Sequence, residues 1–93
     1  MASLRVLKKD IDYLVNEVVS DCYVSTYFHP EKKDEILKVR EEAVALRNNL
    51  FERANNPAEK HNKSLVKKHY AFLRTEMFSK VDDLFGRLSE LNK

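Results

Sequence analysis

The segment NNPAEK (residues 55–60) marks a break in a chain whose pattern is otherwise helical. Asn56 is a residue type preferred at the cap of a helix start, and Pro57 fits the first helical position because its missing N–H needs no partner there. Glu59 lies three residues after Asn56, the spacing at which a glutamate side chain returns a hydrogen bond to the cap. The segment therefore predicts that one helix ends here and that the next begins at residue 57.

The residues just after this break leave a second start open. The stretch EKHNKS (residues 59–64) contains asparagine and serine, whose side chains compete with the helical backbone for hydrogen bonds. A start of the third helix near Ser64 is therefore the alternative.

The other proline divides the chain in the same way, because Pro30 in FHPEKKDE (residues 28–35) lies where a helix would begin. One glycine and two prolines in 93 residues are too few turn residues for a β fold. Short connections make neighbouring helices antiparallel. The sequence thus predicts an all-α fold, an up-down-up three-helix bundle with short loops. It forms a single domain, residues 1–93, with helices near residues 3–27, 31–55 and 57–91.

Apolar residues recur every three or four positions, the spacing of a wide core-facing stripe on a helix. Cys22 falls on the first stripe, so we expect a buried thiol that behaves as a small apolar side chain. The first helix presents Leu4, Leu7, Ile11, Leu14, Val15, Val18, Val19 and Cys22, and the third presents Val66, Tyr70, Leu73, Met77, Val81, Leu84, Leu88 and Leu91. We expect Leu14, Val18, Leu46, Leu50, Leu73, Met77 and Leu84 to be buried.

The middle helix carries two apolar rows with Arg40 and Arg47 between them, one heptad apart. A middle helix that touches both neighbours explains two rows, and the arginine stems then lie along the groove and reach water or an acidic partner. The alternative is that one row is a surface for another chain. The rows are Ile36, Val39, Ala43, Leu46, Leu50 and Ala54, and Leu37, Val44 and Phe51.

The stretch KSLVKKHYAFLR (residues 63–74) is rich in basic residues, although the whole chain has a formal charge of only +2. At about 100° per residue, a basic strip of Lys60, Lys63, Lys67 and Arg74 lines one flank of the third helix, which becomes apolar further along. We expect this strip to be a solvated flank facing the acidic row Asp10, Glu17 and Asp21 of the first helix. The alternative is a surface that contacts the phosphates of nucleic acid.

Chemical motifs are absent from the sequence. No nucleotide-binding loop, nucleophile elbow or zinc-protease motif occurs, and the single cysteine and three histidines are scattered. Asp82 and Asp83 are adjacent on a helix and so do not face each other. We expect neither an enzyme nor a cofactor or metal site. One cysteine also excludes an intrachain disulfide, and with no signal-peptide pattern and no apolar run of membrane length we expect a soluble, cytoplasmic protein without a membrane partner.

Apolar residues also occur off the main stripes, as Leu65 and Phe72 on the third helix and as Val6, Tyr13 and Val24 on the first. Rows of this kind on helices more often mark packing against something than single exposed residues do. They predict a partner surface, covered by a second copy in a homodimer or by a helix of another protein.

Several stretches resemble small all-helical proteins of unknown function from Bacteroides-type bacteria: DIDYLVNEVVSDC, FHP, NNP, LVKKHYAFLR and KVDDLFGRLS. The resemblance spans nearly the whole chain and implies a bacterial, cytoplasmic origin, with no activity to carry over. We therefore expect an uncharacterised, non-enzymatic interaction or structural module that uses helix faces. The alternative is an accessory nucleic-acid-binding protein that uses the basic strip.

Overall fold

The computed structural model describes residues 4–57 and 60–93, which form three long helices and one short turn of 3₁₀ helix. The elements are α1 (Leu4–Phe28), η1 (Pro30–Lys32), α2 (Lys33–Asn55) and α3 (Lys63–Leu91). The described residues contain no β-strand, so the predicted all-α three-helix fold is confirmed. The bundle is about 51 Å long and 17 by 16 Å across.

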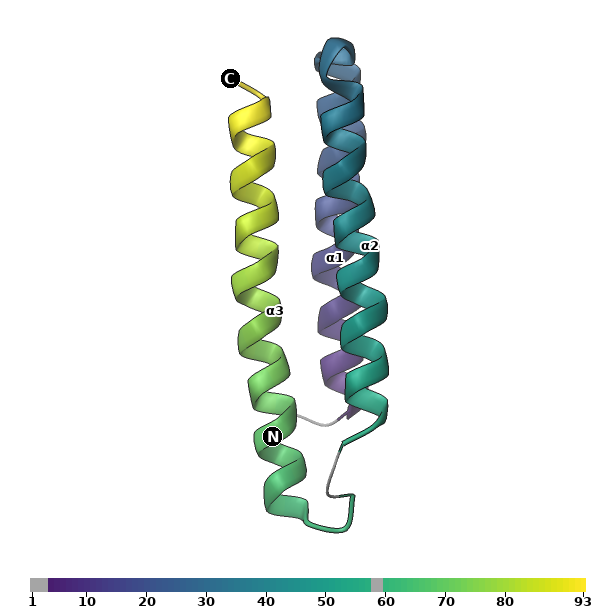
Figure 1. Cartoon of the computed structure of the whole chain (residues 1–93), viewed down its shortest axis with the longest axis vertical. Coiled ribbons are helices and arrows are strands. Elements are labelled where there is room, and N and C mark those ends of the chain that lie inside the picture. The colour runs from purple at the N-terminus through teal and green to yellow at the C-terminus, as the bar shows by residue number, and fades with distance from the viewer. Residues whose placement is uncertain (1–3, 58–59) are drawn as a thin grey trace.

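Figure 1 shows α1 rising from the lower end, α2 returning beside it and α3 rising again. Side-chain contacts fix the same order, because Asp10 pairs with Arg74 near the start of α1 and Ser25 bonds Asn92 near its end. α1 and α3 are therefore parallel, and α2 is antiparallel to both. Below, the lower end is where α1 begins and the upper end is where α1 meets α2.

The third helix begins six residues later than the primary prediction, at Lys63 instead of residue 57. Its cap is Asn62, whose side-chain oxygen accepts a hydrogen bond from the backbone N–H of Leu65 at 3.1 Å. Residues 60–62 are not helical, in agreement with the polar composition of this stretch, and the alternative start near Ser64 was the better one.

Asn56 has a different role from the one predicted, since it follows the end of α2 and caps no helix start. Its side-chain amide donates to the carbonyl oxygen of Glu52 at 2.8 Å. The capping box predicted with Glu59 is therefore wrong at Asn56, and Glu59 itself lies outside the described residues.

Replacing Asn62 with alanine should lower the free energy of unfolding by about 1 kcal/mol, because the N–H of Leu65 loses its acceptor. Asn56→Ala is the matched control, since it removes only an exposed bond at a helix end, and it should cost less. Urea denaturation followed by circular dichroism gives both values. A larger loss from Asn56→Ala would contradict the position of the cap.

The start of α2 is fastened to the far end of the chain. Pro30 opens the η1 turn, as predicted, and Lys32 donates from its Nζ to the carbonyl oxygen of Leu91 at 2.7 Å. A cation at the carboxyl end of α3 satisfies a carbonyl that lacks a helical partner and interacts favourably with the helix dipole. The α1–α2 connection is thus tied to the upper end of α3.

The core follows the predicted stripes closely. Cys22 is buried as expected, and burial, with a smaller effect of the Asp21 charge, raises the pKa of its thiol. Leu14 is the exception among the residues expected at the centre, since it is only half-buried on the flank of the stripe. The buried apolar residues are Leu7, Ile11, Val15, Val18, Cys22, Ile36, Val39, Ala43, Leu46, Leu50, Ala54, Leu73, Met77, Val81, Leu84 and Leu88.

The second apolar row of α2 is not buried between its neighbours, which corrects the primary interpretation. Leu37 and Val44 are exposed and Phe51 is half-buried, whereas every residue of the first row is buried. One wide stripe suffices for α2 to touch both α1 and α3 in a bundle of three helices. The second row therefore lies on the outside, along the flank that faces α1.

Candidate functional site

The groove between α2 and α3 is closed by ion pairs. Arg53 holds Glu76 through two hydrogen bonds of 2.5 and 3.1 Å, and Arg87 pairs with Glu42 at 2.6 Å. The hollow beside them, about 560 Å³, is lined largely by these and other polar side chains. Four charged side chains on this side of the bundle are thus paired within the chain.

The Arg53–Glu76 pair makes stability depend on pH. The hydrogen bond from Arg53 holds the pKa of the Glu76 carboxyl below its ordinary value of 4.5. A lowered folded-state pKa stabilises the protein above the unfolded pKa, and this contribution is lost as the pH falls through the folded value.

As the pH is lowered below about 4.5, the free energy of unfolding of the wild-type protein should therefore fall by up to about 1 kcal/mol more than that of Glu76→Gln. Near neutral pH, the free energies of unfolding of the two proteins should change with pH in the same way. Urea denaturation at a series of pH values measures this, with the exposed Glu41→Gln as the control. Parallel pH profiles for wild type and Glu76→Gln would contradict the role of the pair.

The groove between α1 and α2 contains the two arginines predicted between the rows of α2. Arg47 donates to Asp12 of α1 at 2.6 Å and lies over the ring of Phe51 at 4.2 Å, and Arg40 lies 5.4 Å from the ring centroid of Tyr23. The acidic partner of Arg47 thus belongs to the same chain. A hollow of about 350 Å³ opens near the upper end of this groove.

The groove between α1 and α3 exposes a group of aromatic and apolar side chains. Tyr13, Val24 and Phe28 lie on the α3 side of α1, and Phe78 and Phe85 lie one heptad apart on the α1 side of α3. Phe85 is half-buried, and the other four are exposed by 47–67%. We call these five residues the apolar face.

One ion pair crosses this groove. Arg74 of α3 donates to the carboxylate of Asp10 on α1, and its guanidinium lies 5.4 Å from the ring centroid of Phe78. The pair fixes the register of the two parallel helices. Because both rise about 1.5 Å per residue, Glu17 is level with Val81, and Asp21 is level with Phe85.

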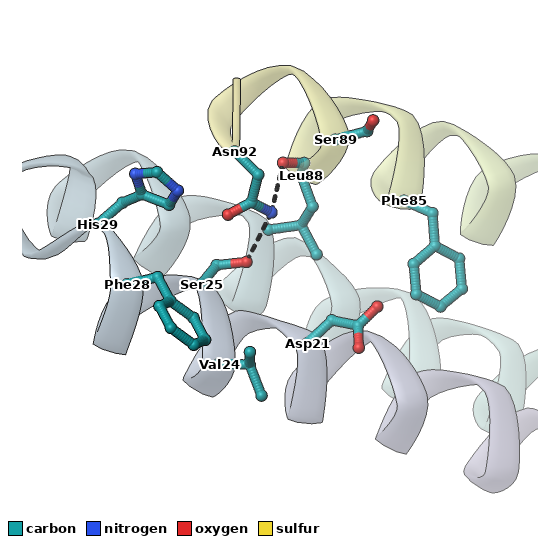
Figure 2. Close-up of a pocket in the computed structure, with 9 residues that line it drawn as sticks. All are labelled: Asp21, Val24, Ser25, Phe28, His29, Phe85, Leu88, Ser89 and Asn92. Atoms are coloured by element: carbon teal, nitrogen blue, oxygen red, sulfur yellow. Dashed lines mark hydrogen bonds between the residues drawn. The ribbon is translucent and has the colours of Figure 1, made fainter.

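A hollow of about 390 Å³ lies at the upper end of the apolar face. Figure 2 shows Val24 and Phe28 on one side of it and Phe85 on the other, with Asp21 between them. At its back the amide of Asn92 donates to the hydroxyl of Ser25 and to the carbonyl oxygen of Leu88, both at 2.9 Å.

The hollow combines one buried hydroxyl with apolar and polar walls. Ser25 is buried, and its hydroxyl accepts a hydrogen bond from the side-chain amide of Asn92. His29, at the rim, lies beside Glu31 at 3.4 Å. The apolar part of the lining comes from Val24, Phe28, Phe85 and Leu88.

The structure brings only part of the predicted basic strip together. Lys60 lies in the turn before α3, so it does not line the helix, and Lys63 is the first helical residue. Lys67 is exposed, and Arg74 is held by Asp10. The strip is therefore shorter and less charged than expected.

Within the described part of the chain, only one residue of the acidic row pairs with the basic strip. Asp10 has its expected partner, but among the described residues Glu17 and Asp21 form no ion pair with the strip. The reason is their height, because at residues level with Glu17 and Asp21 the flank of α3 has already become apolar. The expectation of a fully facing acidic row is wrong for these two residues.

The five residues predicted as a partner surface are all exposed but lie on two different sides. Val6, Tyr13 and Val24 follow the flank of α1 beside α3. Leu65 and Phe72 lie on the α2 side of α3, one turn from His69 and Glu76, both of which contact Arg53. Whether either side binds a partner stays a prediction.

Sequence reasoning missed Phe28 and placed Phe78 only as a continuation of the basic strip. Phe28 ends the α1 row at a helical spacing from Val24, which is the signal that could have identified it. Phe78 and Phe85 share one row, but only the register of α1 against α3 shows that this row meets that of Tyr13 and Val24.

Groups of side chains that could hold a metal ion are absent from the residues described. Likewise, no helix in the described ranges is long and apolar enough to cross a membrane. In comparisons with known proteins, no family model, no curated protein and no solved structure matches the chain.

Proposed function

We propose that this protein is a non-enzymatic interaction module that binds another polypeptide through the apolar face. The observation that carries the proposal is the exposure of Tyr13, Val24, Phe28 and Phe78 on a single side of the bundle.

The composition of the face supports this role. Aromatic side chains are enriched at the centres of protein interfaces, where they bury much area at little cost in side-chain entropy. Contiguous apolar patches on a small bundle are rarely left in water. The hollow beside Phe28 and Phe85 gives the face a concave end into which a side chain of a partner fits.

The alternative, binding of nucleic acid, has less support. It relied on four basic residues in a row, and the pair with Asp10 neutralises Arg74 while Lys60 lies off the helix. Titration of labelled duplex and single-stranded nucleic acid at 50–200 mM salt separates the two functions, over about the range in which phosphate contacts lose most of their affinity. Micromolar binding that Lys63→Glu/Lys67→Glu abolishes would favour the alternative.

Photo-crosslinking tests the proposed function. A photoreactive phenylalanine analogue replaces Tyr13 or, as the matched control, Phe72, which is similarly exposed on the α2 side of α3. Each protein is produced in its native cell and irradiated. The proposal predicts covalent adducts with a defined polypeptide from position 13 and few from position 72. Equal labelling at both positions, or none at position 13, would overturn it.

A further inference from the structure

We infer that the polypeptide bound by the apolar face is a second copy of this chain, packed antiparallel to the first across a twofold axis. The inference rests on the proposed function and adds the identity and direction of the partner. It is carried by the distribution of charge along the face.

The lower half of the face is basic. Lys67 lies on the same row of α3 as Arg74 and Phe78, and Lys63 lies one turn below it. Both lysines are exposed, and the described residues form no ion pair with them. The charge of Arg74 is already matched by Asp10.

The upper half of the face is acidic. Glu17 and Asp21 lie beside the apolar residues of α1, and Asp82 lies about one turn from both Phe78 and Phe85 on α3. These three carboxylates are exposed and, within the described ranges, take part in no ion pair. The face therefore has a positive end, an aromatic middle and a negative end.

An antiparallel second copy matches these ends. With the twofold axis near residue 15 of α1, Val6 of one copy is level with Val24 of the other. Phe78, which is level with Leu14, lies close to the axis and meets Phe78 of the second copy. Lys67 reaches the height of the hollow beside Phe28, with its acidic rim.

A parallel second copy fits poorly, because it places the lysines against lysines and the carboxylates against carboxylates. Like charges opposed across an interface cost several kcal/mol. Glu17 and Asp21 can thus form ion pairs with the lysines of a second copy only if that copy runs antiparallel to the first.

The whole bundle is 51 Å long and 17 by 16 Å across, so one entire side of it projects an area of about 800 Å², which is about what each partner buries in a complex of standard size. A dimer of that size would therefore use nearly the full length of the side that carries the apolar face. A twofold interface uses the same patch on both copies, so the assembly closes at two chains.

A pair of charge variants tests the inference by sedimentation equilibrium. Lys63→Glu/Lys67→Glu makes the whole face acidic, and Glu17→Lys/Asp21→Lys makes it largely basic. Each variant alone should self-associate at least about tenfold more weakly than wild type, because like charges now meet in the antiparallel dimer. Mixed in equal amounts, the two should form a mixed dimer, since acidic and basic halves then face each other at both ends.

Two charge variants outside the apolar face serve as controls. Lys68→Glu and Glu41→Lys, which lie outside the face, should leave self-association unchanged, and circular dichroism confirms that every variant is helical. A wild-type mass of 10.9 kDa at all concentrations up to about 1 mM would overturn the inference, as would a mixture that dimerises no better than its components. If the protein is monomeric while position 13 crosslinks to a different polypeptide, the inference falls and the proposed function stands.

Discussion

Leu73→Ala should lower the free energy of unfolding by about 2–5 kcal/mol, the largest effect expected from a single substitution in this protein. Leu73 is completely buried at the centre of the α3 stripe. Its removal deletes apolar contacts and leaves a cavity that the surrounding helices fill only in part. A domain of this size has a total stability of about 5–10 kcal/mol, so the variant approaches the limit of folding.

Urea denaturation followed by circular dichroism measures the loss, and the same helix provides the control. Leu65 is 43% exposed, so Leu65→Ala removes the same atoms from the surface and should change stability by no more than about 0.5 kcal/mol. Similar losses from both variants would show that the buried stripe of α3 is wrongly assigned.

Ala43→Leu is expected to have the second largest effect, a loss of about 1–3 kcal/mol. Ala43 is completely buried on α2, where a small residue fills the space between the helices. The longer side chain must push neighbouring groups from their packed positions or adopt a strained rotamer.

Ala45→Leu makes the same change two residues away at an exposed position and should alter stability by less than about 0.5 kcal/mol. Thermal melting of the two variants beside wild type gives the comparison. An unchanged or raised melting temperature for Ala43→Leu would mean that the core at this point is loosely packed.

The fold was predictable because two independent features agreed. The apolar spacing identified the buried stripes, and Pro30 and Pro57 divided them into three helices. The start of α3 was less predictable because both Asn56 and Asn62 are good caps, and local sequence does not decide between them. The choice depends on where α3 can pack against α1, which is a property of the whole bundle.

The candidate site was predictable only in its parts. The off-stripe positions of Tyr13 and Val24 indicated exposure, and the parallel order of the first and third helices predicted that Asp10 and Arg74 could pair. The sequence did not reveal that Glu17 and Asp21 face an apolar flank, because this follows from the register of the two helices. Nor did it show that Leu65 and Phe72 lie on a different side from Tyr13.

The α2–α3 and α1–α3 grooves of the bundle therefore differ in how many of their charged side chains form ion pairs within the chain. The α2–α3 groove closes on its own ion pairs through Arg53 and Arg87. The α1–α3 groove has one such pair, at Arg74, and leaves most of its aromatic residues and five charged side chains exposed. This contrast supports the interface that we propose on the second side.

Chemical crosslinking between engineered cysteines tests the antiparallel pairing most directly. In a Cys22→Ala background, which removes the single native thiol, one sample carries Val6→Cys and another Val24→Cys, and a short bifunctional thiol reagent is added to each sample and to their mixture. The antiparallel dimer predicts crosslinked dimer mainly in the mixture, where residues 6 and 24 of different copies lie at one height. Val24→Cys mixed with Phe72→Cys is the control. The antiparallel pairing would be contradicted if Val24→Cys alone crosslinked as efficiently as its mixture with Val6→Cys. It would also be contradicted if that mixture crosslinked no more efficiently than the control mixture.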